Sequence, residues 1–491
     1  MDQDIILALV FPHLDYKDLS VMEKVNRQFY GHVIQVYKSR STFDTKNLNL
    51  RSFPGLALLK LNRLFYNLEK LYLHTLRFKA VDLSVLANLK HLGTLIFDLV
   101  SIDDAILFSQ FLQSMAPQFE ILDLNIDKFD IHIDTPHDFH IALENAQKMK
   151  SLSLRGEYCP RFLPHERSLK NLKSLIIKIL SYPRCIQNLT KFFLWNSQLE
   201  CIELLAFRMF RAYIDLAVTP IEKLKSLKIS NFDLNPIYVV GKCRHLKELV
   251  IGNITYVHED FFKILNLHLG GTLERLEICI KGTNFLPIKL DNLVKLTFLR
   301  IEQLYLSCFS KLASSKLENL RVLNLVNTKI ENDGMDFTNN FPNLKSLKCG
   351  FSDWKQFYDI CHSNSESLQN LELRFTKLDR KTANGDSISS YYYVTSPINH
   401  ANLSTLKLYD LGDNFECLGY FKRNLNLRKT CLSLVKYENI SEIVSNLISF
   451  IKSMEYLVDI RINNPLFQIL RDDARIKSAL STKNIVFLPE D

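Results

Sequence analysis

The stretch Leu68-Glu-Lys-Leu71-Tyr-Leu73 decides the fold, because its spacing of apolar residues returns along most of the chain. Further copies begin at Leu92, Phe119, Met149, Leu172, Leu199, Leu224, Leu246, Leu273, Leu296, Leu320, Leu344, Leu368, Leu403 and Leu457. From Leu68 to Leu403 they begin 22 to 35 residues apart, and a degenerate copy at Leu432-x-Leu434 fills the gap before Leu457. This period predicts stacked units of a short strand and a return segment, since one unit cannot bury its apolar face alone. We therefore expect one elongated domain, although 491 residues would suggest about three.

A second position supports the same register. Ten residues after the first anchor of a copy stands another apolar residue, as at Phe78, Ile102, Leu306 and Ile330. The pattern resembles the leucine-rich repeats, in which this residue is buried on the turn that leaves the strand. The Asn or Cys that this family places two residues earlier is absent, so the repeats resemble the divergent ones of fungal proteins. Over roughly residues 45–488 the resemblance implies an α/β horseshoe of about 16–17 irregular repeats.

Several segments between and around the strands can be predicted individually. Residues 84–89 should form a helical return, and Asn464-Pro465 should begin a helix, because Pro suits its first turn. We expect Leu48-Asn-Leu50 to be the opening strand and residues 485–488 the closing one. An insertion at about 379–400 contains Ser389-Ser-Tyr-Tyr-Tyr393. It predicts a surface loop, either without a role or near a binding surface.

Composition narrows the class of protein. With 47% apolar residues, the chain can bury enough surface to offset its ordering entropy, which excludes disorder as the main state. The early apolar run at residues 5–11 is too short to span a bilayer, so we expect a soluble protein of the cytoplasm or nucleus, without a membrane partner. The ten cysteines include no CxxC pair and predict reduced thiols. The net charge of +8 is spread without a basic run, so we expect no nucleic-acid partner.

No catalytic signature is present, and we expect a non-catalytic protein without a cofactor. The sequence lacks a P-loop, GxGxxG, HExxH and GxSxG. The best metal candidate is the group His132, Asp134, His137, Asp138 and His140, whose mixed ligands would suit a transition metal. A polar turn with scattered histidines is the commoner interpretation, so we predict no metal site.

Residues 1–40 do not follow the repeat and resemble an F-box, the helical module that docks ubiquitin-ligase receptors on a Skp-type adaptor. The residues that carry the likeness are Ile6-Leu7, Val10-Phe11, Leu14, Asp18-Leu19 and Val25-Asn26-Arg27-Gln28-Phe29. Two features depart from the family: Asp2-Gln3 stands where most F-boxes have Leu-Pro, and Asn26 and Phe29 replace a Cys and a Trp. The resemblance implies binding to the adaptor, and through it to a cullin.

The adaptor would be bound by apolar side chains of this segment. Helical spacing places Leu7, Val10, Phe11 and Leu14 on one face, available to a partner's groove. The full predicted set is Leu7, Val10, Phe11, Leu14, Leu19, Val25 and Phe29. The alternative is that these helices only cap the first repeat, as any solenoid needs.

In leucine-rich repeats the residue between the two core leucines, and the one just after them, face the concave side. We predict a target-binding site at Arg300, Lys348, Arg374, Lys407 and Tyr409, on neighbouring strands. Its basic character would suit an acidic or phosphorylated target protein. The alternative is an ordinary solvated strand face of mixed charge.

These features predict an F-box-like helical module at residues 1–40 and a repeat solenoid at residues 41–488. The resemblance implies the substrate-recognition subunit of an SCF-type ubiquitin ligase, with the chemistry on other subunits. A non-degradative scaffold, for example in a kinetochore-type complex, is the alternative.

Overall fold

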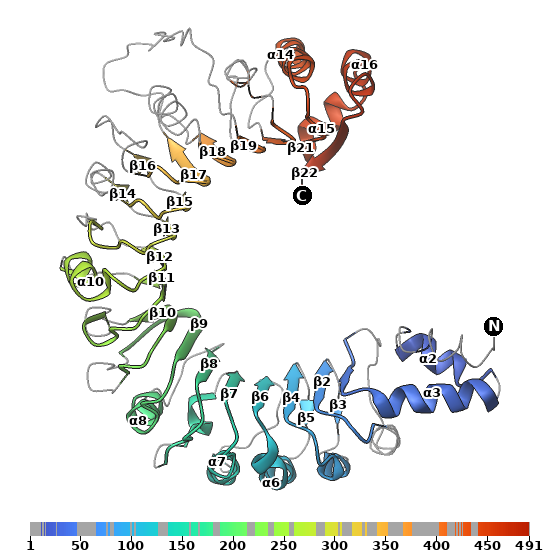
Figure 1. Cartoon of the computed structure of the whole chain (residues 1–491), viewed down its shortest axis with the longest axis vertical. Helices are drawn as coiled ribbons and strands as arrows, with labels where there is room; N and C mark the ends of the chain where they lie inside the picture. The colour runs from blue at the N-terminus through green and yellow to red at the C-terminus, as the bar shows by residue number, and fades with distance from the viewer. Residues whose placement is uncertain are drawn as a thin grey trace. The chain divides into compact units, whose positions relative to one another are not determined.

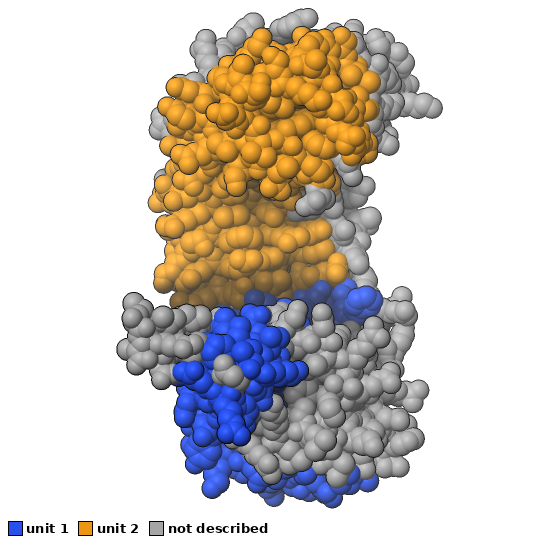
Figure 2. Space-filling view, turned by 90° about the vertical axis from the view of Figure 1, so that its right-hand side faces the viewer, with its two compact units in different colours: residues 1–234 blue, residues 235–491 orange. Residues whose placement is uncertain are grey.

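The computed structural model describes part of the chain in detail. The described residues are 11, 14, 16–25, 27–46, 65–74, 77–78, 83–98, 101–102, 105–125, 136–156, 159–164, 167–179, 187–213, 221–233, 240–254, 260–280, 290–302, 305–306, 317–326, 329–330, 341–351, 367–375, 402–409, 418, 421, 424, 426–433 and 440–490. The chain divides into two compact units, Met1–Leu234 and Asn235–Asp491 (Figure 2). Each unit is described by itself below.

Unit 1 is built on a parallel sheet that follows the order of the chain. Its strands are β1 (Thr42–Asp44), β2 (Lys70–His74), β4 (Thr94–Asp98), β6 (Ile121–Asn125), β7 (Ser151–Arg155), β8 (Ser174–Ile179), β9 (Cys201–Tyr213) and β10 (Ser226–Asp233). Each strand pairs with the next in parallel. Parallel neighbours need a crossover, and the return segments of the repeats supply it.

Unit 2 repeats the same arrangement. Its main strands are β11 (Glu248–Ile254), β12 (Arg275–Ile280), β13 (Phe298–Glu302), β15 (Val322–Val326), β17 (Ser346–Phe351), β18 (Asn370–Phe375), β19 (Thr405–Tyr409), β20 (Lys429–Leu432), β21 (Asp459–Asn463) and β22 (Val486–Glu490). They too pair in parallel in chain order. The predicted α/β leucine-rich-repeat solenoid is confirmed by this pairing in both units, and residues 485–488 fall at the closing strand.

Helices occupy many of the returns. Unit 1 has α2 (Tyr16–Met22), α3 (Arg27–Ser39), α6 (Ala105–Met115), α7 (Pro136–Glu144), α8 (Gln187–Trp195) and the 3-10 helices η2 (Ser84–Asn88), η3 (Ala116–Gln118) and η4 (Cys159–Phe162). Unit 2 has α10 (Phe261–Leu269), α14 (Ile440–Ser453), α15 (Asn464–Leu470) and α16 (Ala474–Ser481). In Figure 1, α6, α7 and α8 lie along one side of the strands of unit 1. The predicted returns at residue 84 and at Asn464 are therefore helical.

The core lies under the apolar positions of the repeat. In β2, Leu71 and Leu73 are fully buried, and the register places Leu95 and Phe97 of β4 beside them. In unit 2, Leu347 and Cys349 of β17 lie beside Leu371 and Leu373 of β18 in the same way. Burying one such leucine contributes about 1.5–3 kcal/mol, so stacking many of them stabilises the fold.

The residues ten places after the first anchor of a repeat also lie on paired strands. Phe78 and Ile102 belong to the short parallel strands β3 (Arg77–Phe78) and β5 (Ser101–Ile102). In unit 2, β14 (Tyr305–Leu306) and β16 (Lys329–Ile330) pair likewise. The ten-residue offset therefore locates a second line of strands. At Cys159 the offset position is fully buried as predicted, whereas at Phe467 it is half-buried.

Two sequence predictions need correction. The strand that precedes β2 is β1, in which Phe43 pairs with Leu71, whereas Leu48-Asn-Leu50 lies outside the described residues. The degenerate repeat is shifted by two residues, because Thr430 and Leu432 occupy the core positions beside Leu406 and Leu408. Thr430 is completely buried, so a threonine fills a place where the template requires a leucine.

A backbone ladder fixes the start of each strand. The carbonyl of Glu120 accepts hydrogen bonds from the N–H groups of Lys150 and Ser151, at 2.8 and 3.1 Å. We call the residue that provides this carbonyl the rim residue of its repeat. In unit 1 the rim residues are Ser41, Glu69, Gly93, Glu120, Lys150, Lys173 and Glu200. In unit 2 they are Lys247, Glu274, Thr297, Arg321, Lys345, Gln369, Ser404, Arg428 and Val458.

Three further findings bear on the chemistry of the chain. Among the described residues no helix is long and apolar enough to cross a membrane. The cysteines within the described ranges, Cys159, Cys201, Cys243, Cys279, Cys349 and Cys431, form no disulfide. The same part of the chain contains no group of three or more His, Cys, Asp or Glu side chains that could hold a metal ion.

Candidate protein-interaction surfaces

The N-terminal helices build a small core of their own. Phe11, Leu19 and Val33 are almost completely buried. The Phe11 ring meets the ring of Phe29 edge-on, with centroids 5.5 Å apart, and that of His32 at 6.0 Å. These contacts join the segment before α2 to the first half of α3, so the helices form a packed module.

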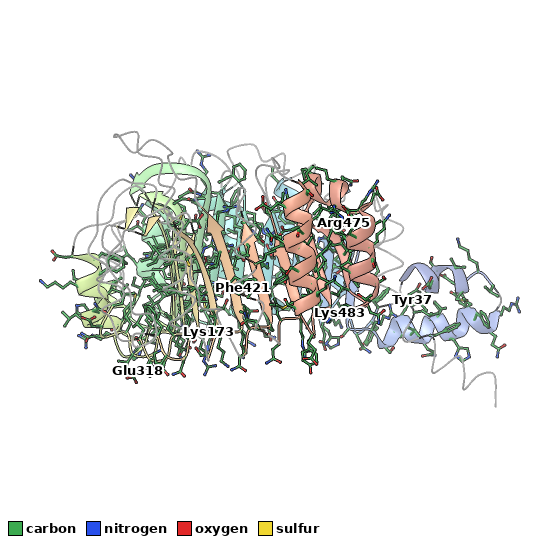
Figure 3. The ribbon with its side chains drawn as sticks, turned by 90° about the horizontal axis from the view of Figure 1, so that it is seen from above. Tyr37, Lys173, Glu318, Phe421, Arg475 and Lys483 are labelled. Atoms are coloured by element: carbon green, nitrogen blue, oxygen red, sulfur yellow. The ribbon has the colours of Figure 1, made fainter. Side chains whose placement is uncertain are left out.

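The end of α3 contacts the first repeats. Tyr37 is buried and packs on Phe65 at a centroid distance of 5.1 Å, while Phe65 also meets Phe43 of β1 at 5.2 Å. The Asn67 amide donates to the carbonyl of Lys38 at 3.1 Å. Figures 1 and 3 show α2 and the rest of α3 extending beyond the first strands of unit 1. The end of α3 therefore caps the solenoid, and the remainder of the module projects from it.

The projecting part carries apolar side chains that the chain itself does not cover. Val21 is 58% exposed, Val25 55% and Tyr30 48%. They lie at the end of α2, in the turn that follows and in the first turn of α3. Exposed apolar residues this close in sequence on a packed module mark a surface that can bind a partner.

The predicted adaptor-binding residues fall into three groups. Val25 is exposed, while Leu14 and Phe29 are half-buried. The expectation that the Phe11 side chain faces a partner is not met, because Phe11 packs inward on Phe29; Leu19 is buried as well. Leu7 and Val10 lie outside the described residues. Val21 and Tyr30 were missed, since the family pattern assigns them no apolar role.

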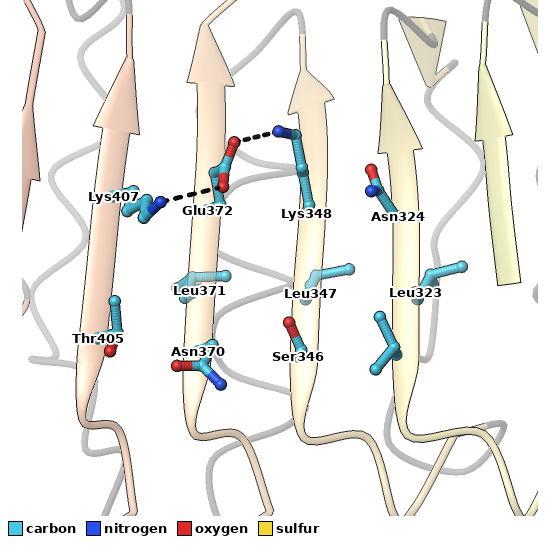
Figure 4. A pocket seen from close by; sticks show the side chains of 11 residues that line it. Leu323, Asn324, Ser346, Leu347, Lys348, Asn370, Leu371, Glu372, Thr405 and Lys407 are labelled. Carbon is cyan, nitrogen blue, oxygen red and sulfur yellow. Dashed lines mark ion pairs between the residues drawn. The ribbon is translucent and has the colours of Figure 1, made fainter. Parts of the chain in front are cut away.

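On the concave face of unit 2 an acidic side chain lies between two basic ones. Glu372 of β18 forms an ion pair with Lys348 of β17, and its other oxygen lies 3.9 Å from Lys407 of β19. Register explains the geometry, because Lys348, Glu372 and Lys407 are direct neighbours across the three strands. Figure 4 shows both lysines directed at the carboxylate. With Asn324 and Thr405 they line a hollow of about 370 Å³.

One row further along the strands a second network begins. The guanidinium of Arg374 lies over the ring of Tyr409, 5.9 Å from its centroid, a distance at which cation–π attraction acts. The Tyr409 hydroxyl donates a 2.8 Å hydrogen bond to Glu490 of β22. Burial, together with this bond to a carboxylate, raises the pKa of the Tyr409 phenol above its usual value. The phenol therefore stays a hydrogen-bond donor at neutral pH.

The structure brings four of the five predicted target-binding residues together, on β17, β18 and β19, and separates Arg300 from them. Arg300 of β13 donates to Glu302 at 2.7 Å and lies 3.8 Å from Glu277. Its charge is thus neutralised locally. The predicted basic character of the concave face is weaker than the sequence suggests, because cross-strand carboxylates accompany Arg300, Lys348 and Lys407.

On the concave face of unit 1, too, carboxylates pair with the basic side chains. Arg155 of β7 reaches Asp123 of β6 at 2.9 Å and Asp98 of β4 at 3.5 Å. His74 lies between Asp44 and Asp98, at 3.4 and 3.5 Å. Arg155 stands just after the core residue Leu154, a position that is expected to face the concave side. Its carboxylate partners come from strands 32 and 57 residues earlier, which only the observed register reveals.

The two cations Arg428 and Lys429 at the start of β20 were not identified from the sequence. Arg428 and Lys429 line a polar pocket of about 380 Å³ with Asn402, Ser404, Thr405 and Asn426. The misplaced register of the degenerate repeat left Arg428 and Lys429 out of the expected strand. Leu427, which lies 24 residues after Leu403, is the signal that could have located it.

The other chemical candidates from the sequence have no support in the described residues. A ring nitrogen of His140 lies 2.5 Å from the carbonyl oxygen of Arg161, while the side chains of the other four residues in the candidate metal group are outside the described set. Burial raises the pKa of Cys243 to about 12 and also raises that of Cys349. Both thiols therefore stay protonated, which does not suit a nucleophile.

Comparisons with known proteins name no family for this chain. No protein-family model matches the chain, and no curated protein sequence matches it. Among solved structures, an internalin from Listeria monocytogenes is similar over 77% of this chain and 91% of its own, with 18% identity and a TM-score of 0.40. The plant peptide hormone receptor RGFR1 in complex with RGF2 is similar over 90% of this chain and 74% of its own, with 10% identity and a TM-score of 0.37.

Proposed function

We propose that this chain is the substrate-recognition subunit of an SCF-type ubiquitin ligase. In this proposal the N-terminal module docks on a Skp-type adaptor, and through it on a cullin, while the repeats hold a target protein. The chain contributes proximity and no catalytic residue, and it acts in the cytoplasm or nucleus. The proposal extends the general role of a repeat scaffold that binds proteins.

The observation that carries the proposal is the exposed apolar surface of a module with its own core. A segment that only capped the solenoid would bury its apolar side chains against the first repeat. Here Tyr37 does so, whereas Val21 and Val25 are exposed to solvent. Docking a partner helix on such a surface would remove these side chains from water. The F-box-like sequence pattern supports the adaptor as that partner.

The test is co-purification of the adaptor with the tagged full-length chain from its own cells. The double variant Val21→Glu, Val25→Glu should lose the adaptor, because each buried charge would lack a partner. Leu267→Glu on α10 is the matched control, since Leu267 is 73% exposed and remote in sequence from the module. Both variants should melt close to the wild type. If the wild type recovers no adaptor, or the double variant recovers it fully, the docking proposal is wrong.

A second measurement separates a degradative receptor from a non-degradative scaffold. With the proteasome blocked, a receptor should bring down polyubiquitinated partners through its repeats. The Val21→Glu, Val25→Glu variant should still bind those partners but without the ubiquitin ladder. A scaffold would show adaptor binding and no ladder in either case.

A further inference from the structure

The polar pocket at the starts of β19 and β20 is held by the backbone ladder. The N–H groups of Arg428 and Lys429 both donate to the carbonyl of Ser404, at 3.0 and 3.1 Å. The Ser404 hydroxyl donates to the carbonyl of Gln369 at 3.1 Å. These bonds fix where the two cationic side chains leave the sheet, and the pocket between them measures about 380 Å³.

The two cations of this pocket have no acidic partner within the described ranges. No carboxylate there lies within ion-pair distance of Arg428 or Lys429. The carboxylate in register with Lys429 is Asp459, and it faces Arg461 at 3.2 Å instead. The Thr405 hydroxyl, which also lines the pocket, donates to no described residue. The pocket therefore has positive charge and a hydroxyl donor to offer a ligand.

Rim cations of the earlier repeats, together with Lys225 at the start of β10, are paired. Lys150 contacts Glu120 at 2.7 Å, and Lys173 and Lys225 share Glu200 at 3.0 and 2.6 Å. Hydrogen bonds from Lys225 and Lys173 lower the pKa of the Glu200 carboxyl. Lys247 contacts Glu274 at 2.9 Å. From Arg321 onward the rim column has no acidic residue, so the cations Arg321, Lys345 and Arg428 lack the neighbours that neutralise the earlier ones.

The concave site at Lys348 and Lys407 differs from this pocket, because a carboxylate already neutralises its cations. An anion that approached Lys348 and Lys407 would have to displace Glu372, which already contacts both. At Arg428 and Lys429, by contrast, an anion would not have to displace any of the described carboxylates. A guanidinium can bind two oxygens of one phosphoryl group, and an ammonium adds a point charge. A phosphorylated side chain carries a charge of about −1.5 to −2 at neutral pH, which two cations would balance.

We propose that the Arg428–Lys429 pocket binds a phosphoryl group on a peptide of the target protein. Arg428 and Lys429 neutralise the phosphoryl oxygens, and the Thr405 hydroxyl donates to one of them. Thr405 also lines the concave hollow of about 370 Å³ beside Lys407 and Glu372. The peptide next to the phosphoryl group can therefore extend onto the concave face, which a free phosphate ion would not use. The inference rests on the part of the proposed function in which the repeats hold a protein, and it does not depend on adaptor docking.

The test uses the purified full-length chain and bead-displayed peptides in which one fixed phosphoserine is flanked by randomised positions. The same library with serine in place of phosphoserine is the reference. The wild type should retain phosphoserine beads over serine beads, and Arg428→Gln, Lys429→Gln should reduce that preference roughly tenfold or more. Lys150→Gln, which removes a paired rim cation, is the matched control and should leave the preference unchanged.

Each outcome decides the matter. Equal retention of the two libraries by the wild type overturns the proposal, as does an unchanged preference in the double variant. If inorganic phosphate binds to the wild type and not to the double variant, while the libraries remain equal, the pocket takes free phosphate and the peptide proposal is wrong. Adaptor co-purification with the double variant should stay at the wild-type level, so failure here is distinguishable from failure of the docking proposal.

Discussion

Tyr409 and Glu490 are joined by a 2.8 Å hydrogen bond although their strands, β19 and β22, are three places apart in the sheet of unit 2. Neighbouring strands lie about 4.8 Å apart, so the two side chains together span roughly 14 Å of sheet. The bond connects residues 81 positions apart in the sequence. It ties the closing strand to the interior of the sheet.

Tyr409→Phe should lower the free energy of unfolding by about 1–2 kcal/mol, because Glu490 loses its donor in a partly buried site. Urea unfolding followed by circular dichroism measures the change. Tyr456→Phe is the control, since Tyr456 is exposed and should change the free energy by no more than about 0.5 kcal/mol. Equal effects of the two substitutions would show that the bond contributes nothing.

The same hydroxyl predicts a pH dependence of stability. The pKa of Tyr409 is raised above its ordinary value of 10.0, first by burial and then by Glu490. A folded-state pKa above the unfolded one gives stability that is present below the unfolded pKa and is lost as the pH rises past it. The advantage of the wild type over Tyr409→Phe should therefore shrink as the pH rises from about 10 upward. A constant advantage over that range would contradict the assignment.

Thr430→Val should stabilise the chain. The Thr430 hydroxyl is buried in a core position of β20 and has no hydrogen-bond partner in the structure, so replacing it with a methyl group removes a desolvation penalty of about 1 kcal/mol or more. Thermal unfolding measures the change. Thr297→Val is the contrast, since the Thr297 hydroxyl donates to the carbonyl of Glu274 at 3.0 Å and its loss should not stabilise. A lower melting temperature for Thr430→Val would mean that the hydroxyl is satisfied in solution.

Charge reversal on the concave face should weaken target binding. Arg374→Glu, Lys407→Glu places two carboxylates beside Glu372, so an acidic target peptide would be repelled. Partners that co-purify with the wild type should be lost, more so at low salt, while the adaptor stays bound. Lys178→Glu on β8 of unit 1 is the control. Retention of the same partners by the double variant would place the target elsewhere on the repeats.

The regular part of the fold could be predicted from the sequence because it depends on local spacing. Leucines at the positions of Leu68, Leu71 and Leu73 specify a strand, its core face and its register. The prediction failed where another residue could serve the same purpose. Thr430 is small enough to fill a core position, so the search for leucines placed this repeat two residues too late. Phe43 replaces leucine in the opening strand, so the same search did not find that strand.

The candidate sites were predictable only in part, because their chemistry depends on neighbours across strands. The sequence identified Lys348, Lys407 and Arg374 as concave, and the register agrees. It could not show that Glu372 neutralises both lysines, since that depends on side chains 24 and 35 residues away meeting in space. Phe11 illustrates the converse: helical spacing marks an apolar face but does not tell whether the chain or a partner covers it.

Because of the ladder of shared rim carbonyls, the length of a repeat can vary while the spacing of side chains on the sheet stays constant. Successive repeats differ in length from 22 to 35 residues, yet the main strands from β2 to β21, with the exception of β11, begin with the same pair of N–H bonds to the previous repeat. Length variation is therefore absorbed in the returns, and the spacing of side chains on the sheet stays constant. A return between two strands can be shortened or exchanged without moving the side chains that face each other across the sheet, such as Glu372 and Lys407. The ligand specificity of the face and the surface shape of the opposite side can thus be engineered independently.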